Sequence, residues 1–331
     1  MSVAVKGIFI VGAKRTPFGT FGGVFRNTSA TELQTIAAIA ALKEAGVAPD
    51  QVDSVIVGQV MSASQTDGIY TPRHAALKAG IPQDRPALGV NRLCGSGFQS
   101  IVNSAQDILT GAARISLAGG VENMSQAPFA VRGVRFGTVL GSSYAFEDTL
   151  WAGLTDSYCG LPMGMTAEKL GAQFGITRDE VDNFALRSQQ RWKKSNDAGV
   201  FKAEIEPVTL TIKRKEVKVD TDEHPRPQTT IEGLKKLPPV FKKEGLVTAG
   251  SASINEAFVA QTLSCAKALK VDMEKLNVNG GATALGHPLA ASGSRITAHL
   301  VHELKRRGLK RAIGSACIGG GQGIAVMVEA V

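Results

Sequence analysis

The sequence predicts an α/β fold in which parallel strands alternate with helices. Short apolar runs at 54–60, 87–90 and 115–119 have the length of buried strands, and helical patterns separate them. The alternation returns after residue 257, which predicts two related βαβ halves with layered helices and sheets. Between the halves no regular period is present, so we expect an inserted loop domain. The predicted divisions are a first half (1–121), the loop domain (122–247) and a second half (248–331).

The first half is expected to begin with a strand at 7–12, an apolar run of strand length. Residues 31–45 predict a helix, because Thr31 can cap it, its apolar residues lie on one face, and Gly46 ends it. The other predicted elements of this half are the strands 54–60, 87–90 and 115–119 and the helices 72–78 and 98–109.

The loop domain and the second half are interpreted by the same periodicities. Helical spacing predicts helices at 165–174, 178–195, 257–269 and 292–307. Strands are predicted at 278–280, 312–316 and 323–328. Lysines and prolines cluster at 213–243, where substrate contacts are expected.

The composition indicates a globular protein that binds small molecules. The chain has 331 residues, of which 44% are hydrophobic and 20% charged, and no apolar run reaches the length of a membrane span. The net charge of +8 fits a nucleic acid, an acidic membrane surface or an anionic small substrate as partner, and because only 5% of the residues are aromatic, nucleic acid is disfavoured. The four cysteines lie far apart, without the paired spacing of zinc sites, so we expect free thiols and no metal.

The beginning of the sequence is basic, as mitochondrial targeting segments are. Four basic residues precede the first acidic one, Glu32: Lys6, Lys14, Arg15 and Arg26. Because residues 7–12 are also expected to form a strand, no cleavable leader is predicted. The sequence therefore favours the mitochondrial matrix with an uncleaved N-terminus, and the cytoplasm is the alternative.

A cysteine lies at the turn between the predicted strand 87–90 and the helix that follows it, in the stretch Asn-Arg-Leu-Cys-Gly-Ser-Gly. Small residues after Cys94 let a substrate approach the backbone closely. The positive end of a helix dipole favours a thiolate, so we expect a lowered pKa for this thiol. A buried structural cysteine is the alternative. We interpret Cys94 as a nucleophile, because glycine and serine surround it.

Three further reactive groups lie in the second half. His287 lies between Gly286 and Pro288, where a rigid turn suits a general base, although an isolated histidine is more often structural. Cys317 ends a predicted strand and enters a turn of three glycines whose backbone N–H groups can donate to an oxyanion; otherwise it is an incidental cysteine in a hairpin. Asn255, in Asn-Glu-Ala-Phe, would by itself pass as a helix cap.

Together these motifs resemble the four signature motifs of the thiolases. They are Asn-Arg-Leu-Cys-Gly-Ser-Gly around Cys94, Asn-Glu-Ala-Phe from Asn255, Gly-His-Pro around His287, and Cys-Ile-Gly-Gly-Gly-Gln-Gly from Cys317. Their shared order makes the resemblance specific, and it covers the whole chain. Within the family, the sequence is most similar to the mitochondrial 3-ketoacyl-CoA thiolase (acetyl-CoA acyltransferase) branch. The resemblance implies a thiolase-like fold of two related halves with a loop domain.

By resemblance, the chain is an acyltransferase that cleaves 3-ketoacyl-CoA with CoA in fatty acid β-oxidation. Cys94 would hold the acyl group as a thioester in a ping-pong reaction. His287 would activate Cys94 and stabilise an oxyanion, and Cys317 would donate and accept protons. The family also implies a water held by Asn255 and a backbone N–H of Gly319 as oxyanion donors. CoA is a substrate, and no other cofactor is implied.

The resemblance also implies partners. Arg226, Thr229 and Ser253 would contact CoA, whereas without the family Arg226 is interpreted as a solvated loop charge. A homodimer or homotetramer is expected, with no nucleic acid and no transmembrane segment.

The chain departs from the family pattern by a missing segment. The stretch Val-Thr-Ala-Gly-Ser-Ala-Ser ends at Ser253 and runs directly into the Asn255 motif, where full-length thiolases have roughly 65 more residues, judged by length and element order. The second half is therefore expected to be incomplete, with interior strands lost and apolar helix faces exposed. Smaller departures are Ser251 in place of asparagine and Ala290 in place of glycine.

The sequence leaves alternatives open. An acetoacetyl-CoA thiolase acting in synthesis would use the same chemistry, and the acyl chain length is not specified. A shortened, catalytically impaired thiolase is another alternative, because several hundred Å² of lost apolar burial, at about 25 cal/mol per Å², would remove the usual stability margin. A ketoacyl synthase is disfavoured, since that relative lacks the second thiol and Cys317 is present here.

Overall fold

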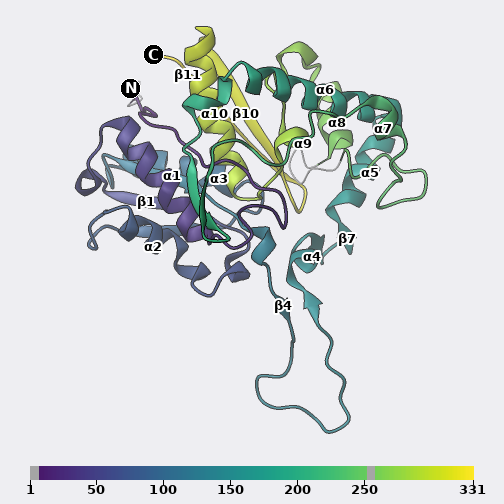
Figure 1. Ribbon diagram of the computed structural model, residues 1–331, viewed down its shortest axis with the longest axis horizontal. Coiled ribbons are helices and arrows are strands. Elements are labelled where there is room, and N and C mark those ends of the chain that lie inside the picture. Colours follow the sequence, from purple (N-terminus) through teal and green to yellow (C-terminus); the bar gives the residue numbers. More distant parts are fainter. Residues whose placement is uncertain (1–6, 252–257) are drawn as a thin grey trace, which may run out of the picture.

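A parallel sheet covered by helices forms the centre of the first half (Figure 1). The computed structural model describes residues 7–251 and 258–331. The elements of this half are α1 (Ala30–Ala45), β1 (Ser54–Gly58), α2 (Thr71–Lys78), β2 (Ala87–Val90), α3 (Ser96–Thr110) and β3 (Ser116–Gly120). β1 lies between β2 and β3 and pairs in parallel with both, which confirms the predicted α/β alternation.

The main core of this half forms around β1, because every residue of β1 is buried. Val55 and Val57 pack in one cluster with Leu33 and Leu42 of α1 and Ala76 of α2. Fully burying an aliphatic side chain contributes roughly 1.5–3 kcal/mol, so this cluster holds the helices on the sheet. The sheet in turn fixes the end of β2, from which the Cys94 turn begins.

Helix α1 begins one residue earlier than predicted, and its cap is Ser29 rather than Thr31. The hydroxyl of Ser29 accepts a hydrogen bond from the backbone N–H of Glu32 at 3.1 Å. Thr31 is buried instead, with its hydroxyl 3.1 Å from that of Thr71 in α2. Gly46 ends the helix with φ 64, as expected. The contact between α1 and α2 therefore determines the role of Thr31.

Residues 7–12 do not form the predicted strand. No backbone hydrogen bond joins them to another residue in the part of the chain that the structure describes. Phe9 is 60% exposed and Val11 is 61% exposed. Since a strand is stabilised by pairing with a neighbour, an apolar run without one remains an extended, unpaired segment.

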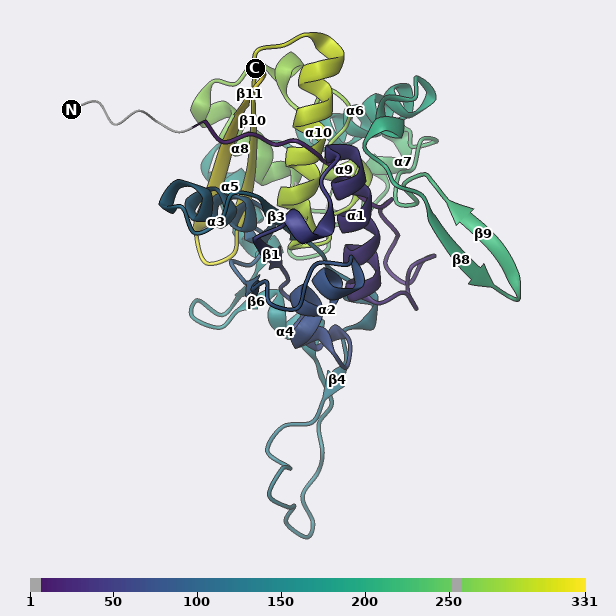
Figure 2. The same cartoon turned by 90° about the vertical axis from the view of Figure 1, so that its left-hand side faces the viewer.

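The second half supplies a long helix and a hairpin, which fits the expected incomplete second half. Its described elements are α8 (Val259–Leu269), α9 (Ala282–Leu285), α10 (Ala291–Arg307), β10 (Arg311–Ile318) and β11 (Gln322–Glu329). β10 and β11 pair antiparallel, and α10 packs against both α3 and β10 (Figure 2). The strand predicted at 278–280 is a turn instead, because Asn279 is held by hydrogen bonds to Ser195, His299 and Glu303.

The region between the two halves has a core of its own. Its elements are β4 (Phe129–Ala130), β5 (Glu147–Asp148), α4 (Thr149–Gly153), β6 (Thr155–Asp156), β7 (Leu161–Pro162), α5 (Met163–Gln173), α6 (Arg178–Asp197), β8 (Val208–Ile212), β9 (Lys215–Val219) and α7 (Ile231–Lys235). Val181 and Phe184 of α6 pack with Leu234 of α7 and with Val259 and Ala260 of α8. The segment between β4 and β5 projects from the body (Figures 1 and 2). None of the helices in the described ranges is long and apolar enough to span a bilayer.

A buried ion network joins the first segment of the chain to this middle region. The Nε of Arg15 donates to Glu204 at 2.8 Å, and its Nη1 donates to Asp222 at 2.7 Å. The second oxygen of Glu204 lies 2.7 Å from Nδ1 of His299 in α10. Burial by itself would raise the pKa of Glu204, but the charge of Arg15 and the His299 hydrogen bond outweigh it and hold the pKa at about 2.

Glu204 is expected to make stability depend on pH in acid. Its folded pKa of about 2 lies below the ordinary value of 4.5, so its pairing stabilises the fold above pH 4.5 and this contribution is lost as the pH falls towards 2. In urea unfolding, the difference in unfolding free energy between the parent chain and Glu204→Gln should narrow between about pH 5 and about pH 3. A difference that stays constant over this range would contradict the ion pairing.

Candidate active site

Cys94 lies in a tight turn between β2 and α3, as the strand-to-helix pattern predicted. The Oδ1 of Asn91 accepts a hydrogen bond from the backbone N–H of Leu93 at 2.9 Å. The hydroxyl of Ser96 accepts from the N–H of Arg92 at 2.9 Å and donates to the carbonyl of Leu93 at 2.6 Å. Leu93 has φ 47, a conformation that side chains rarely adopt. These bonds hold a strained turn that places Cys94 just before the first residue of α3.

The turn of Cys94 lies against the residues that follow Cys317, because a Cβ at Gly95 would lie 2.3 Å from the side chain of Ile318. The backbone N–H of Gly319 is near enough to Cys94 to oppose a rise in its pKa, and Cys94 is near enough to Cys317 to raise the pKa of that thiol. A Cβ at position 319 would lie 3.1 Å from the side chain of Leu93, so glycine allows this close approach. The fold thus brings together two thiols that are far apart in the sequence.

Burial, rather than the helix dipole, governs the ionisation of both thiols. Burial raises the pKa of Cys94 to about 11, although the N–H of Gly319 opposes this effect. Burial, and then the neighbouring Cys94, raise the pKa of Cys317 to about 12. The expected low pKa of Cys94 is therefore wrong, because loss of water around the sulfur outweighs the dipole. Both groups are neutral thiols near pH 7, and Cys94 needs a base to become a nucleophile.

His287 lies in the loop between α9 and α10 and is buried. Its Nδ1 is 2.5 Å from the hydroxyl of Ser292, and its Nε2 makes no hydrogen bond within the described residues. Burial, followed by the nearby charge of Arg295, lowers the pKa of His287 well below its usual value. The loop packs on the first turn of α3, since a Cβ at Gly97 would lie 2.4 Å from the Ala290 carbonyl oxygen. A neutral imidazole here is able to accept a proton.

Glu122 links the segments of the site, and the sequence analysis did not single it out. Its carboxylate accepts hydrogen bonds from the backbone N–H groups of Met61 at 2.8 Å, Val60 at 3.1 Å and Ala290 at 3.3 Å. One carboxylate thus joins the ends of β1 and β3 to the loop of His287. Burial raises the pKa of Glu122 to about 7 despite these donors. The available signal was an acidic residue at the carboxyl end of a predicted parallel strand.

Gln261 is a second residue that the pattern did not single out. It lies in the first turn of α8, and its side chain is near enough to Cys317 to oppose the rise in the pKa of that thiol. Cys265, one turn further along the same helix, also lies near Cys317. The helix was predicted, but only the fold brings these side chains near the thiol.

Two of the predicted CoA contacts line a cavity beside the His287 loop. Arg226 and Thr229 lie on the wall of a cavity of about 430 Å³. The hydroxyl of Thr229 donates to the Arg226 carbonyl at 2.6 Å, which orders this loop. His224, on the same wall, has its Nδ1 2.8 Å from the Ala284 carbonyl, close to the start of the Gly-His-Pro turn. The cavity therefore adjoins the loop that carries His287.

The remaining two predicted site residues, Ser253 and Asn255, lie outside the described residues. On either side of them, the N–H of Val259 donates to the Ser251 carbonyl at 3.2 Å, so the described ends are close together. The hydroxyl of Ser251 accepts from the N–H of Thr248 at 2.9 Å, which gives this serine a structural role in the turn. The oxyanion water of Asn255 and the CoA contact of Ser253 stay predictions.

Comparisons with known proteins cover nearly the whole chain. The thiolase N-terminal domain matches residues 8–257, and the thiolase C-terminal domain matches residues 220–330. The human mitochondrial 3-ketoacyl-CoA thiolase is 48% identical over 392 residues, with 98% of each chain covered. An acetyl-CoA acetyltransferase of Rhizobium meliloti is 37% identical over 389 residues, covering 97% of this chain and 98% of the relative.

Solved structures agree with this relationship. The crystal structure of the human mitochondrial 3-ketoacyl-CoA thiolase matches with a TM-score of 0.95 and 48% identity, and that of the same thiolase in complex with CoA matches with a TM-score of 0.94; each match covers 98% of both chains. Because the human relative aligns over 392 positions and this chain has 331 residues, at least 61 of those positions (392 less 331) have no counterpart here. This difference agrees in size with the expected internal deletion of roughly 65 residues. The chain, although shortened, belongs to the thiolase family.

Proposed function

We propose that this chain cleaves 3-ketoacyl-CoA with CoA, releasing acetyl-CoA and a shortened acyl-CoA. The observation that carries the proposal is that the strained turn of Cys94 packs against Ile318 and Gly319, which directly follow Cys317: a Cβ at Gly95 would lie 2.3 Å from the Ile318 side chain, and one at Gly319 would lie 3.1 Å from that of Leu93. The relatives at 48% identity are named mitochondrial 3-ketoacyl-CoA thiolases, which supports both this substrate class and a place in β-oxidation in the mitochondrial matrix.

In the first half-reaction, His287 takes the proton of the Cys94 thiol, and the thiolate attacks the 3-keto carbon. The imidazolium of His287 and a water held by Asn255 stabilise the oxyanion. The bond between C2 and C3 then breaks, leaving the acyl group on Cys94 as a thioester. The departing acetyl-CoA enolate accepts the proton of the Cys317 thiol.

In the second half-reaction, the Cys317 thiolate takes the proton of an incoming CoA thiol. The CoA thiolate attacks the acyl-Cys94 thioester, and the N–H groups of Cys94 and Gly319 stabilise the new oxyanion. Collapse releases the shortened acyl-CoA, and the Cys94 thiolate recovers its proton from His287. A pKa of about 12 suits Cys317 for this role, because the thiol stays protonated until a carbanion forms beside it.

CoA is proposed to lie with its phosphates towards Arg226 and its thiol at Cys94. The support is the cavity of about 430 Å³, which Arg226 and Thr229 line and which adjoins the His287 loop. A guanidinium is well suited to bind phosphate groups, since it carries a permanent charge and several donors. Ser253 is proposed as a further contact.

Cys317→Ala is expected to separate the two roles of the thiols. Without its proton donor, turnover should fall roughly 10²–10⁴-fold, the usual loss for a general acid–base group. Acylation of Cys94 by an acyl-CoA thioester should remain detectable by intact-protein mass spectrometry. Turnover equal to that of the parent chain would refute the proton-shuttle role of Cys317.

The proposal is tested by a thiolysis assay on the purified 331-residue protein. Loss of 3-ketoacyl-CoA and release of acetyl-CoA, both dependent on added CoA, are the expected results. A series of acyl chain lengths separates this activity from an acetoacetyl-CoA thiolase, which would accept only the shortest member. Absence of CoA-dependent cleavage with every member would overturn the proposal.

One observation favours a second candidate, a thiolase variant with impaired turnover. At least 61 positions of the human relative have no counterpart here, and residues 7–12 have no backbone partner among residues 7–251 and 258–331. Such a chain would bind CoA and yet show no acyl-enzyme. A broad, non-cooperative thermal transition with dye binding would support it.

We also propose that the chain assembles with copies of itself through the projecting segment 131–146, between β4 and β5. Phe136 is 99% exposed and Leu140 is 103% exposed, and contiguous exposed apolar groups mark interaction surfaces. Leu140→Asp should lower the assembly mass in light scattering and leave the urea midpoint of the dissociated protomer unchanged. A parent chain that is monomeric at every concentration would contradict this assembly.

A further inference from the structure

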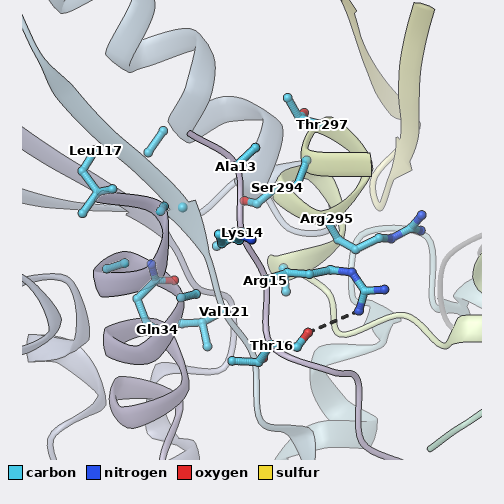
Figure 3. A pocket seen from close by; sticks show the side chains of 18 of the residues that line it. Ala13, Lys14, Arg15, Thr16, Gln34, Leu117, Val121, Ser294, Arg295 and Thr297 are labelled. Carbon is cyan, nitrogen blue, oxygen red and sulfur yellow. Dashed lines mark hydrogen bonds between the residues drawn. The ribbon is translucent and has the colours of Figure 1, made fainter. Parts of the chain in front are cut away.

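A cavity of about 300 Å³ lies along the free side of β3. Residues 115–121 line one wall, and the extended segment 8–13 lines another. Figure 3 shows this segment, continuing from Ala13 to Thr16, crossing between Leu117 and Val121 on one side and α10 on the other. The cavity therefore separates two extended stretches of backbone.

Both stretches have backbone groups available for pairing. The odd-numbered residues of this stretch make the backbone hydrogen bonds to β1 and its flanks. The backbone N–H of Asp53 donates to the Ile115 carbonyl, and the backbone N–H of Val121 donates to the Gly58 carbonyl. Successive residues of a strand direct their backbone groups to alternate sides, so Ala118 directs its N–H and C=O away from β1. Residues 7–12 make no backbone hydrogen bond within the described chain. Within the described residues, β3 is therefore an unpaired edge of the sheet, and residues 7–12 are an extended stretch without a backbone partner.

Most of the side chains that α1 and α3 present to the cavity are small or apolar, and Gln34 and Ser104 are the polar exceptions. Ala37 and Ala41 of α1 line it, as do Ile101, Ala105 and Ile108 of α3. A strand between two helical layers needs such side chains, because they cover it closely without competing for its hydrogen bonds. The chemistry of the walls therefore matches that of a buried sheet position.

The length of the relatives suggests which part of the chain is missing between β3 and residues 7–12. At least 61 positions of the human relative have no counterpart in this chain, and within the described residues the free edge of β3 and the unpaired residues 7–12 enclose a mostly apolar cavity. We propose that the cavity is a vacant strand position, which binds an extended apolar polypeptide equivalent to the segment that this chain lacks. The bound strand pairs with β3 on one side and converts residues 7–12 into a strand on the other. This inference concerns binding and is independent of the catalytic proposal.

Fluorescent synthetic peptides test the inference with the complete 331-residue protein. The peptides cover the stretch of the human relative that has no counterpart in this chain, in overlapping pieces of roughly 15 residues, enough to include a whole strand. We expect at least one peptide to give a saturable rise in fluorescence anisotropy. The same peptide should slow backbone hydrogen exchange in β3 and at residues 7–12.

Two matched controls test whether the peptide binds by pairing as a strand with β3. Ala118→Pro removes an outward backbone donor of β3 without removing a bond to β1, and it should weaken binding at least about tenfold. Methylating the backbone nitrogens of the bound peptide leaves the protein unaltered and should have a similar effect.

Three outcomes would overturn the inference. One is that no peptide of the set binds, and another is that binding survives both controls, which would indicate non-specific apolar adhesion. The third is that protection of β3 from hydrogen exchange increases with protein concentration and does not increase with peptide concentration. This result would show that a second copy of the chain, and not the peptide, pairs with β3. Because anisotropy and exchange report binding alone, each outcome is independent of whether thiolysis is detected.

Discussion

Cys94→Ala is expected to remove thiolytic turnover, lowering kcat at least about 10⁴-fold, as loss of a catalytic nucleophile does. The reason is that the acyl group has no other acceptor at the turn. Cys317 is the neighbouring thiol, but its pKa of about 12 suits it for proton transfer rather than for nucleophilic attack. Incubation with an acyl-CoA thioester, followed by intact-protein mass spectrometry, should show acylation of the parent chain and none of the variant.

Cys159→Ala is the matched control, because Cys159 is a free and exposed thiol outside the site. This variant should keep both the acyl adduct and the turnover of the parent chain. An acyl adduct of undiminished amount in Cys94→Ala, mapped to another cysteine, would show that the nucleophile has been assigned to the wrong residue.

Arg15→Ala is expected to lower the free energy of unfolding by about 3–5 kcal/mol, the usual result of removing one partner from a buried ion pair. The substitution leaves the carboxylates of Glu204 and Asp222 without their cation, and both are buried. It also removes the contacts of the guanidinium with the rings of Phe18 and Phe201. Urea unfolding monitored by circular dichroism measures the loss.

Arg311→Ala is the control for Arg15→Ala. Arg311 forms a bidentate pair with Glu329 in the β10–β11 hairpin, but its guanidinium is exposed to solvent. An exposed pair contributes little, because water and salt screen it, so the midpoint should not change measurably. Equal losses in the two variants would show that burial of the Arg15 network does not determine its contribution.

Local pattern predicted much of the fold for a physical reason. Strand β2 and the turn and helix after it depend on apolar periodicity and on Gly111, which ends α3 with φ 80, and these lie where the sequence placed them. The prediction for residues 7–12 used the same apolar pattern and was wrong. A strand also requires a neighbouring backbone, and no pattern within six residues reports whether one is present.

The candidate active site was likewise predicted in part from local motifs and in part missed. The motif order identified Cys94, His287 and Cys317, because nucleophile, base and proton carrier require particular side chains beside tight turns. Glu122 and Gln261 were missed, since a carboxylate that accepts three backbone N–H groups and an amide beside a thiol have no local signature.

The sequence by itself determined the family, the order of the reactive groups and the absence of a long internal segment, because these depend on which residues are present and in what order. Only the tertiary structure decided that both thiols are protonated at rest, that one carboxylate joins three segments of the site, and that, among the residues described, β3 has a free edge beside a mostly apolar cavity. The physical reason is that desolvation and strand pairing depend on atoms contributed by distant parts of the chain.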